Sequence, residues 1–526
     1  MAVDLRIKEH PILEFKRGPK VKIYYGRKKI DAYEGETVGA ALYAAGINVF
    51  TRSVKYHRPR GMFCAIGKCS SCMMRVDGVP NVMTCVIPVR DGMRVEPQNC
   101  FPSASHDLYS IIDRLGFKFP AGFYYRLITR PRSLSALYLK LIRPLTGMGK
   151  FPTANRGFKP MTKSEQRETE VAVVGAGPAG LSAAIHAARL GCKVTLIDEN
   201  HRLGGQLIKQ THMFFGSKEY FAGVRGIRIS EKLAEEVKQH ENIEALLNTS
   251  VVGLYNGNVL GIVQGNKFAT MRAKKVIVST GAYEKTLLFN NNDLPGVMGA
   301  GGVQTLMNVF GIKPGNEALM VGAGNVGLII SYQLLQAGVK VKGIVEAVPR
   351  IGGYFVHAAK IRRMGVPIYV SHTIKRTWGR RRVEGATIVQ LDDRWKEVEG
   401  TEKDIKCDII CISVGLKPTY EFLYQAGCKM KFISELGGHV PLRTKNMETS
   451  VKGVYIPGDT GGIEEADTAM VGGKIAGISA ALSLEYGDKE AEEFRKKAIM
   501  ELKELRSGPT SARIRSGIEK ALIEEG

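Results

Sequence analysis

Two glycine fingerprints, in residues 175–180 and 322–327, constrain the fold of this chain more than any other feature. Each has the pattern Gly-x-Gly-x-x-Gly, directly after an apolar strand and directly before a predicted helix. In a dinucleotide-binding βαβ unit, the first glycine permits the turn and the second lets a pyrophosphate approach the backbone. The third lets the helix pack on the strand. The 526-residue chain is therefore predicted to contain two Rossmann-type domains.

The first fingerprint follows the strand Val171–Val174, and the next predicted strand ends at Asp198. An acid about 20 residues after the last glycine bonds the ribose hydroxyls of an adenosine, and Glu199 is the alternative for this role. The three fingerprint residues are Gly175, Gly177 and Gly180.

Further segments favour FAD over a free dinucleotide at this first site. HRLGGQL (201–207) would cross the pyrophosphate and ribityl chain, VIVSTG (276–281) ends a strand beside the nucleotide, and GVYIPGD (453–459) supplies an acid for a ribityl hydroxyl. A helix from about Ala466 would aim its N-terminus at the pyrimidine edge of the flavin. The residues assigned to FAD in these segments are Gly205, Gln206, Thr280, Gly281, Gly458 and Asp459.

The second fingerprint follows the strand Ala318–Val321, and its second strand ends at Glu346. An acid at that place favours a free 2′-hydroxyl, which indicates NAD over NADP. The sequence leaves open whether this domain binds NAD, binds another adenine nucleotide, or only packs. Its glycines are Gly322, Gly324 and Gly327.

Four of the nine cysteines lie close together in the sequence, in GMFCAIGKCSSCMMRVDGVPNVMTC. The spacing C-x4-C-x2-C-x12-C begins as the plant-type [2Fe–2S] spacing. The alternatives are a structural zinc site, which more often shows two C-x2-C pairs, and disulfides, which a reducing cytosol disfavours. The predicted cluster ligands are Cys64, Cys69, Cys72 and Cys85.

The residues around these cysteines predict a small β-grasp ferredoxin. A β-hairpin with alternating Val21, Ile23 and Tyr25 precedes a helix over 36–45, which Thr37 starts. RVEPQ (94–98) is predicted to be the last strand. The five remaining cysteines are expected to be buried apolar side chains.

The composition is that of a globular protein, with 44% apolar residues, but Lys and Arg number 75 against 51 Asp and Glu, a formal charge of +24. Basic runs such as KRTWGRRR (375–382) invite a nucleic-acid interpretation, which we disfavour because no nucleic-acid-binding motif accompanies them. A surface for an acidic partner, or one adapted to high temperature, explains the charge better. No apolar run reaches the length of a membrane span, and the first residues lack the apolar core of a signal peptide. We therefore expect a cytoplasmic protein without an integral membrane segment.

The order FAD half, NAD-type insertion, FAD half resembles the two-dinucleotide-binding-domain flavoproteins of the pyridine nucleotide–disulfide oxidoreductase class. With the ferredoxin module in front, the chain resembles the α-type FAD/[2Fe–2S] subunits of heteromeric sarcosine oxidase, opine oxidase, hydrogen cyanide synthase and hydroxyproline dehydrogenase. The matching stretches are PRGMFCAIGKCSSCMMRVDGVPNVMTC, PAGFYYRLITRP (120–131), NNDLPGVMGAGGVQTLMN (291–308) and GVYIPGDTGGIEEADTAMVGGKIAGISAAL. The chain lacks a redox cysteine pair near either fingerprint, so disulfide chemistry is not expected.

The fold class is therefore α/β, a β-grasp [2Fe–2S] ferredoxin-like domain followed by a two-dinucleotide-binding-domain flavoprotein of FAD/NAD-type Rossmann units. The expected domains are the ferredoxin (20–98), a linker (99–166), the first FAD part (167–295), the inserted NAD-type domain (296–420), the second FAD part (421–486) and a helical C-terminal tail (487–526).

The resemblance implies an electron-transfer subunit of an amino-acid or secondary-amine dehydrogenase or oxidase. Its partner would be a catalytic, amino-acid oxidase-like flavoprotein subunit, and the resemblance leaves room for a further small subunit. The alternative is a stand-alone NADH:acceptor oxidoreductase. The sequence names no catalytic residue: Tyr283 and Glu284 follow the 279–281 turn, but a plain turn explains them as well.

Overall fold

The computed structural model describes residues 3–115, 122, 128–142, 162–214, 218, 221–265 and 267–524. The chain divides into two compact units, each made of two separate segments. Unit 1 comprises Met1–Phe158 and Glu284–Val414, and unit 2 comprises Lys159–Tyr283 and Gly415–Gly526. The ferredoxin segment and the second fingerprint therefore share unit 1, whereas the first fingerprint lies in unit 2.

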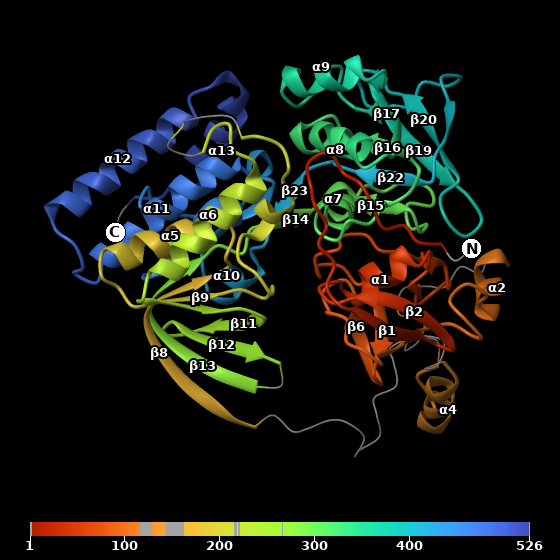
Figure 1. Cartoon of the computed structure of the whole chain (residues 1–526), viewed down its shortest axis with the longest axis horizontal. Helices are drawn as coiled ribbons and strands as arrows, with labels where there is room; N and C mark the ends of the chain where they lie inside the picture. Colours follow the sequence, from red (N-terminus) through yellow and green to blue (C-terminus); the bar gives the residue numbers. More distant parts are fainter. Residues whose placement is uncertain are drawn as a thin grey trace. The chain divides into compact units, whose positions relative to one another are not determined.

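The N-terminal part of unit 1 is the predicted β-grasp module (Figure 1). Its sheet has the order β2-β1-β7-β5-β6, and α1 begins after Thr37, whose side chain accepts a hydrogen bond from the Ala40 N–H. Val21 and Ile23 are buried in the hairpin, which confirms the alternation. The elements are β1 (Lys20–Tyr25), β2 (Lys28–Tyr33), α1 (Val38–Ala44), β3 (Thr51–Arg52), β4 (Pro59–Arg60), β5 (Met73–Val76), β6 (Val79–Met83) and β7 (Arg94–Pro97).

Between the ferredoxin module and unit 2, the described residues form η1 (Leu108–Ser110), α2 (Ile111–Arg114) and α4 (Arg132–Ile142). Most of the PAGFYYRLITRP stretch lies outside the described residues. The finer domain boundaries given above remain predictions.

The second part of unit 1 is a parallel Rossmann sheet with the order β15-β22-β16-β17-β18. Its strands are buried and rich in aliphatic residues, as expected for a sheet covered on both faces. A second, antiparallel sheet, β19-β20-β21, contains the hairpin of the KRTWGRRR run. The elements are β15 (Val297–Gly299), α7 (Ala300–Asn308), β16 (Glu317–Val321), α8 (Asn325–Gln336), β17 (Lys340–Val345), α9 (Phe355–Arg363), β18 (Ile368–Tyr369), β19 (His372–Trp378), β20 (Gly385–Gln390), β21 (Lys403–Lys406) and β22 (Ile409–Ile412).

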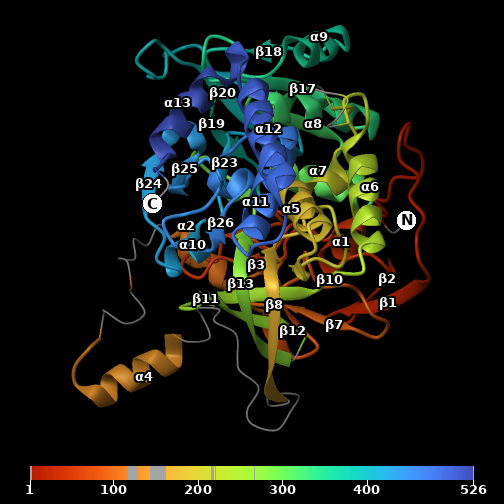
Figure 2. The ribbon, with the colours of Figure 1, turned by 90° about the vertical axis from the view of Figure 1, so that its left-hand side faces the viewer.

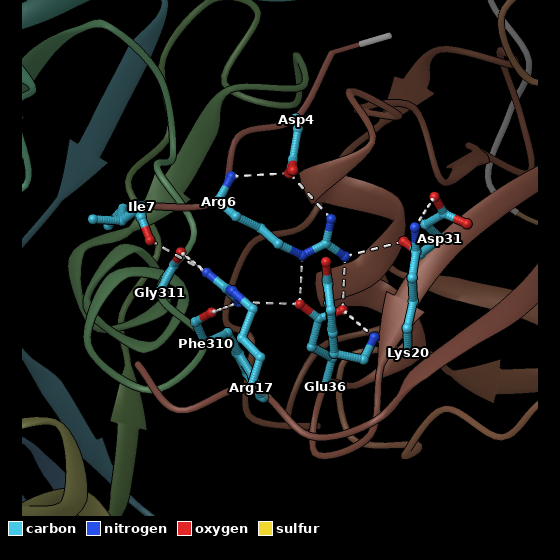
Figure 3. Close-up of polar contacts among 10 residues, drawn as sticks. Asp4, Arg6, Ile7, Arg17, Lys20, Asp31, Glu36, Phe310 and Gly311 are labelled. Carbon is cyan, nitrogen blue, oxygen red and sulfur yellow. Dashed lines mark hydrogen bonds and ion pairs between the residues drawn. The ribbon is translucent and has the colours of Figure 1, made fainter. Parts of the chain in front are cut away.

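A buried ion network ties the N-terminal segment to the ferredoxin module and to the end of α7 (Figure 3). Arg6 binds the Glu36 carboxylate through two N–H groups, at 2.7 and 2.8 Å. Arg17 reaches the same carboxylate at 3.3 Å and also donates to the carbonyls of Phe310 and Gly311. Because the Glu36 side chain is only 5% exposed, these charges are largely shielded from water.

Unit 2 is built on a seven-stranded mixed sheet, β10-β9-β8-β13-β12-β11, with β26 pairing with β13. Strands β10, β9, β8, β13 and β26 are parallel, and β11 and β12 extend the sheet as an antiparallel ribbon. The elements are β8 (Thr162–Val174), α5 (Pro178–Arg189), β9 (Val194–Ile197), η2 (Gly205–Lys209), α6 (Gly226–Gln239), β10 (Ile243–Leu246), β11 (Thr249–Tyr255), β12 (Val259–Gln264), β13 (Lys267–Val278), α10 (Glu421–Gln425), β24 (Met430–Ile433), η4 (Ser434–Leu436), β25 (Gly438–Pro441), β26 (Val454–Tyr455), η5 (Gly458–Gly461) and α11 (Ala466–Leu482).

Small residues let α11 pack directly on α5, and Figures 1 and 2 both show the two helices side by side. A Cβ atom on Gly473 or on Gly477 would collide with the α5 backbone at Ala179 or Ala183. The hydroxyl of Ser182 donates to the Met470 carbonyl at 2.7 Å. This close approach positions the start of α11 beside the first fingerprint.

The C-terminal tail forms α12 (Lys489–Leu505), η6 (Pro509–Ser511) and α13 (Ala512–Ala521), which confirms the predicted charged helices. They belong to unit 2. Three two-stranded ribbons complete the described structure: β3 with β4, β24 with β25, and β14 (Ala282–Glu284) with β23 (Leu416–Pro418). Among the described residues, none of the helices combines the length and hydropathy needed to span a bilayer.

We expect Glu36→Gln to destabilise unit 1, because Arg17 loses its anion and Arg6 keeps only its ion pair with the exposed Asp4. Removing one partner of a buried ion pair costs on the order of 3 kcal/mol, which should appear as a lower urea midpoint of unfolding. The matched control is Lys20→Met, which removes the exposed Lys20–Asp31 pair and should leave the midpoint unchanged. Equal midpoints for Glu36→Gln and wild type would contradict the role given to this network.

Candidate functional site

The four predicted cluster ligands come together in unit 1, on the loop before β5 and the residues after β6. The Cys64 thiol contacts those of Cys69 and Cys85, and the Cys85 thiol also contacts that of Cys72. Thiol hydrogen bonds from Cys69 and Cys85 hold the pKa of Cys64 well below its ordinary value. Among the described residues, no group of three or more His, Cys, Asp or Glu side chains is placed to hold a single metal ion. The contacts link all four thiols in the order Cys69, Cys64, Cys85 and Cys72, so the four predicted ligands lie together as the donor set of a [2Fe–2S] cluster.

Backbone N–H groups point at the sulfur atoms, as an iron–sulfur loop requires. Those of Ile66 and Lys68 hydrogen-bond to Cys64, and that of Gly67 donates to the Cys85 sulfur at 3.3 Å. Gly67 has φ +71, a left-handed conformation that glycine adopts without strain. The chain thus provides both the thiolates and the donors that a [2Fe–2S] cluster would use.

The cluster loop is anchored to the Rossmann part of unit 1 by an interface between residues 58–64 and residues 291–302. A Cβ atom on Gly302 would collide with the Phe63 carbonyl oxygen, so the start of α7 lies directly against the backbone at Cys64. The Gly299 N–H donates to the same Phe63 carbonyl at 3.1 Å. Arg58 binds Asn291 at 2.5 Å and Asp293 at 3.2 Å.

This 58–64/291–302 interface gives a structural role to two of the stretches that carry the family resemblance. PRGMFC and NNDLPGVMGAGG are the two sides of one contact, including the close approach of Gly61 to Pro295. Sequence reasoning missed the contact, although the run of small residues at 299–302 was a signal for close packing.

The first fingerprint has the geometry of a pyrophosphate loop. Gly175 has φ +102, and a Cβ atom on Gly180 would collide with the Gly175 carbonyl, so both glycines serve the fold. Gly177 differs, because a Cβ atom there would have its nearest neighbour, the Gly205 Cα, at 3.9 Å. The space beside Gly177 is therefore open at the N-terminus of α5, where a pyrophosphate would lie.

The structure separates the two candidates for the ribose acid. Asp198 is buried at the end of β9, and its carboxylate accepts from the Ala176 N–H at 2.6 Å and from Asn200. Burial raises the pKa of Asp198. Glu199 is exposed. Asp198 therefore lies against the fingerprint loop, as predicted for the ribose acid, whereas Glu199 does not contact that loop through any of these bonds.

The residues predicted on the flavin side also converge within unit 2. The Gly281 N–H donates to the Thr460 hydroxyl at 2.8 Å, next to Gly458, which has φ +68. The Thr280 hydroxyl donates to the Thr419 carbonyl at 3.2 Å. The 279–281 turn and η5 therefore lie side by side, which joins the two FAD segments of the chain.

Two polar groups at this junction, the partly buried Asp459 carboxylate and the Thr419 hydroxyl, fit a bound cofactor. The Asp459 carboxylate accepts one hydrogen bond, from the Glu464 N–H at 3.2 Å, and its burial raises the pKa to about 7. The hydroxyl oxygen of Thr419 is buried without a partner. A polyhydroxylated ribityl chain would supply the missing partners. Gln206 is exposed, whereas Gly205 lies against the fingerprint loop.

The second fingerprint repeats this construction. The Glu346 carboxylate accepts from the Ala323 N–H at 2.7 Å, as Asp198 does from Ala176. The Gly352 and Gly353 N–H groups donate to the Ala323 carbonyl, as the Gly204 N–H does to that of Ala176. The space beside Gly324 is open. Gly322 and Gly327 correspond to Gly175 and Gly180. The geometry therefore provides for an adenine nucleotide at both fingerprints.

Other candidate residues have structural roles. Glu284 accepts from the Gly301 N–H at 2.5 Å, at the start of α7, and Tyr283 donates to Glu421 at 3.5 Å. Cys407 and Cys411 are buried, as expected, whereas Cys100 is only partly buried, so the expectation for all five outlying cysteines was wrong at that position.

Two family models match the chain. The model described as pyridine nucleotide-disulphide oxidoreductase matches residues 169–473, more than half of the chain. The model described as 2Fe-2S iron-sulfur cluster binding domain matches residues 18–100. Together they cover both fingerprints and the four cysteines.

Two curated relatives and one solved structure are similar to large parts of this chain. The sarcosine oxidase subunit alpha of Rhizobium meliloti is 29% identical over 66% of this chain, and this chain spans only 36% of its length. The hydrogen cyanide synthase subunit HcnB of Pseudomonas aeruginosa is 26% identical over 66% of this chain and 77% of that protein. The crystal structure of L-proline dehydrogenase from P. horikoshii shares the fold, with a TM-score of 0.63 and 23% identity over 93% of this chain and 79% of that chain.

We expect Cys69→Ser to abolish the cluster while FAD is retained, because the ligands and the flavin residues lie in different units. The measurements are iron and FAD content per chain. Cys100→Ser is the matched control and should keep its iron. Unchanged iron content in Cys69→Ser would refute the ligand assignment.

We expect Gly177→Val to prevent FAD retention without unfolding the chain, because the side chain would fill open space that the pyrophosphate needs. Flavin occupancy and the circular dichroism spectrum are the measurements. Gly324→Val, the matching change at the second fingerprint, should retain FAD. Normal flavin occupancy in Gly177→Val would contradict the assignment.

The geometry and the family models agree on the nature of the chain. Unit 2 has an FAD site at the first fingerprint, and unit 1 has a four-thiol loop for a [2Fe–2S] cluster beside a second Rossmann domain. The chain therefore belongs to the pyridine nucleotide-disulphide oxidoreductase family, as an FAD- and [2Fe–2S]-containing oxidoreductase with an N-terminal ferredoxin-like domain, and it is similar to a sarcosine oxidase subunit alpha and a hydrogen cyanide synthase subunit HcnB.

Proposed function

We propose that this chain is the electron-transfer subunit of a heteromeric amino-acid or secondary-amine dehydrogenase. The observation that carries the proposal is the presence of the four-thiol loop and the FAD site in one chain, together with relatives that are named as subunits of such enzymes. In this proposal a partner flavoprotein oxidises the substrate in the cytoplasm, and this chain takes up the electrons.

The cofactors suit that task, because a flavin accepts two electrons at once and a [2Fe–2S] cluster accepts one at a time. The chain's own residues would hold them in place. Gly177 and Asp198 would position the pyrophosphate and ribose, Asp459 the ribityl chain, and the loop at Cys64 the cluster.

The described residues around the FAD site support a relay role rather than substrate oxidation. Just after the 279–281 turn in the sequence, Glu284 accepts a hydrogen bond from the Gly301 N–H at the start of α7. Tyr283 donates a hydrogen bond to Glu421. Neither is positioned by these contacts as a base for an amine substrate.

The alternative, an NADH:acceptor oxidoreductase, draws on the second fingerprint. The open space at Gly324 and the acid Glu346 fit an adenine nucleotide. A nucleotide bound there would serve either to stabilise the fold or to donate a hydride. Reduction by NADH is therefore the deciding observation.

We expect the purified chain to be reduced slowly, if at all, by NADH alone. The tagged chain, isolated from its native source, should bring a second flavoprotein with it. In that complex, sarcosine, proline or hydroxyproline should reduce the flavin and the cluster, followed by visible absorbance and by the paramagnetic signal of the reduced cluster. Rapid bleaching by NADH without a partner would overturn the subunit proposal in favour of the reductase.

A further inference from the structure

The C-terminal helices α12 and α13 pack on unit 2 beside α11 and the η5 turn, which carry part of the predicted FAD site. Helix α12 lies along α11, as Figure 2 shows, and Ala498 and Leu502 are buried in the core between them. The buried Lys474 of α11 lies 3.6 Å from Glu501 and over the ring of Phe494 at 4.3 Å. The tail is therefore an integral part of the FAD unit.

The residue that caps the C-terminal end of α12, Arg506, binds an acid that follows η5. Arg506 forms a two-pronged ion pair with Glu464, with N–O distances of 2.7 and 2.6 Å. The Arg506 and Glu464 side chains are only 15% and 8% exposed, so solvent screens this pair weakly. The backbone N–H of Glu464 is the group that donates to the Asp459 carboxylate.

Helix α13 holds a second arginine against the same turn. Arg443 is buried and donates to the carbonyl oxygen of Gly461, the last residue of η5. Its own backbone is fixed by the tail, because its N–H donates to Ala521 and its carbonyl accepts from Ile523, both at 3.0 Å. Burial lowers the pKa of Arg443 to about 10, so it is still a cation at neutral pH.

The acids around the η5 turn are therefore partly offset by two arginines that the tail supplies or holds. Arg443 and Arg506 face Glu464, and Asp459, Glu465 and Asp467 are the acids close to it. Without Arg506, the turn that carries Asp459 would have an additional uncompensated negative charge beside it.

We propose that the C-terminal helices are part of the flavin site, in which Arg506 and Arg443 position the Gly458–Gly461 turn and the charge of Arg506 offsets that of Glu464, so that removing either charge alone shifts the reduction potential of the bound FAD. Reduction adds electrons to the flavin, so a nearby positive charge favours the reduced form and a nearby negative charge opposes it. Arg506 acts here as a positioning residue. The inference requires FAD in unit 2 and holds whichever donor reduces the chain.

The test measures the flavin potential of the full chain with both cofactors bound, by reductive titration against a reference dye. Arg506→Met should lower the equilibrium constant for flavin reduction about tenfold, or ~30 mV for a two-electron couple. Glu464→Gln should raise it by a similar factor. The double variant Arg506→Met/Glu464→Gln should return close to wild type, because the charge of the pair is then zero again.

Lys520→Met is the matched control, because it removes one positive charge from the same tail but from an exposed pair with Glu435. It should leave the flavin potential unchanged. FAD content is measured in every variant, which separates loss of cofactor from a change in potential. Shifts of the same sign in Arg506→Met and Glu464→Gln, or no shift in either with FAD fully bound, would overturn the proposal.

Discussion

The structure of unit 1 depends on the contact between the backbone at Phe63–Cys64 and the glycine run that begins α7. Two backbones can approach this closely only where one side has no Cβ, so Gly302 is required for the cluster loop to rest on the Rossmann sheet. Arg58, bound to Asn291 and Asp293, and the buried Arg6–Glu36–Arg17 network then hold the two parts from either side. The second Rossmann domain thus supports the cluster, whether or not it binds a nucleotide.

Unit 2 is organised by a comparable close approach. Gly473 and Gly477 let α11 contact α5, and this brings the η5 turn beside the first fingerprint. The partly buried Asp459 carboxylate accepts from a single donor, which leaves it able to accept further hydrogen bonds from a ligand. The C-terminal helices close this side of the unit, with Arg506 and Arg443 offsetting the acids near the turn.

The two nucleotide loops have the same arrangement of hydrogen bonds, one in each unit. In each, an acid at the end of the second strand binds the N–H of the alanine inside the fingerprint, and a later glycine N–H binds the carbonyl of that alanine. The similarity explains why the sequence pattern alone identified both loops. It also explains why the pattern could not show what the second one binds, since the same backbone geometry supports a redox, structural or empty site.

Local patterns in the sequence determined the elements that depend on neighbouring residues: the fingerprint loops, the Thr37 cap of α1, the four-thiol spacing and the helical tail. Their geometry is set by a few adjacent dihedral angles and side chains, so the pattern is sufficient. Only the tertiary structure placed the ferredoxin module in the same unit as the second Rossmann domain, buried Asp198 against the fingerprint loop while Glu199 is exposed, and brought Arg443, Glu464 and Arg506 to the η5 turn. These contacts join residues far apart in the sequence, and their energy comes from burial and charge pairing, which no local pattern records.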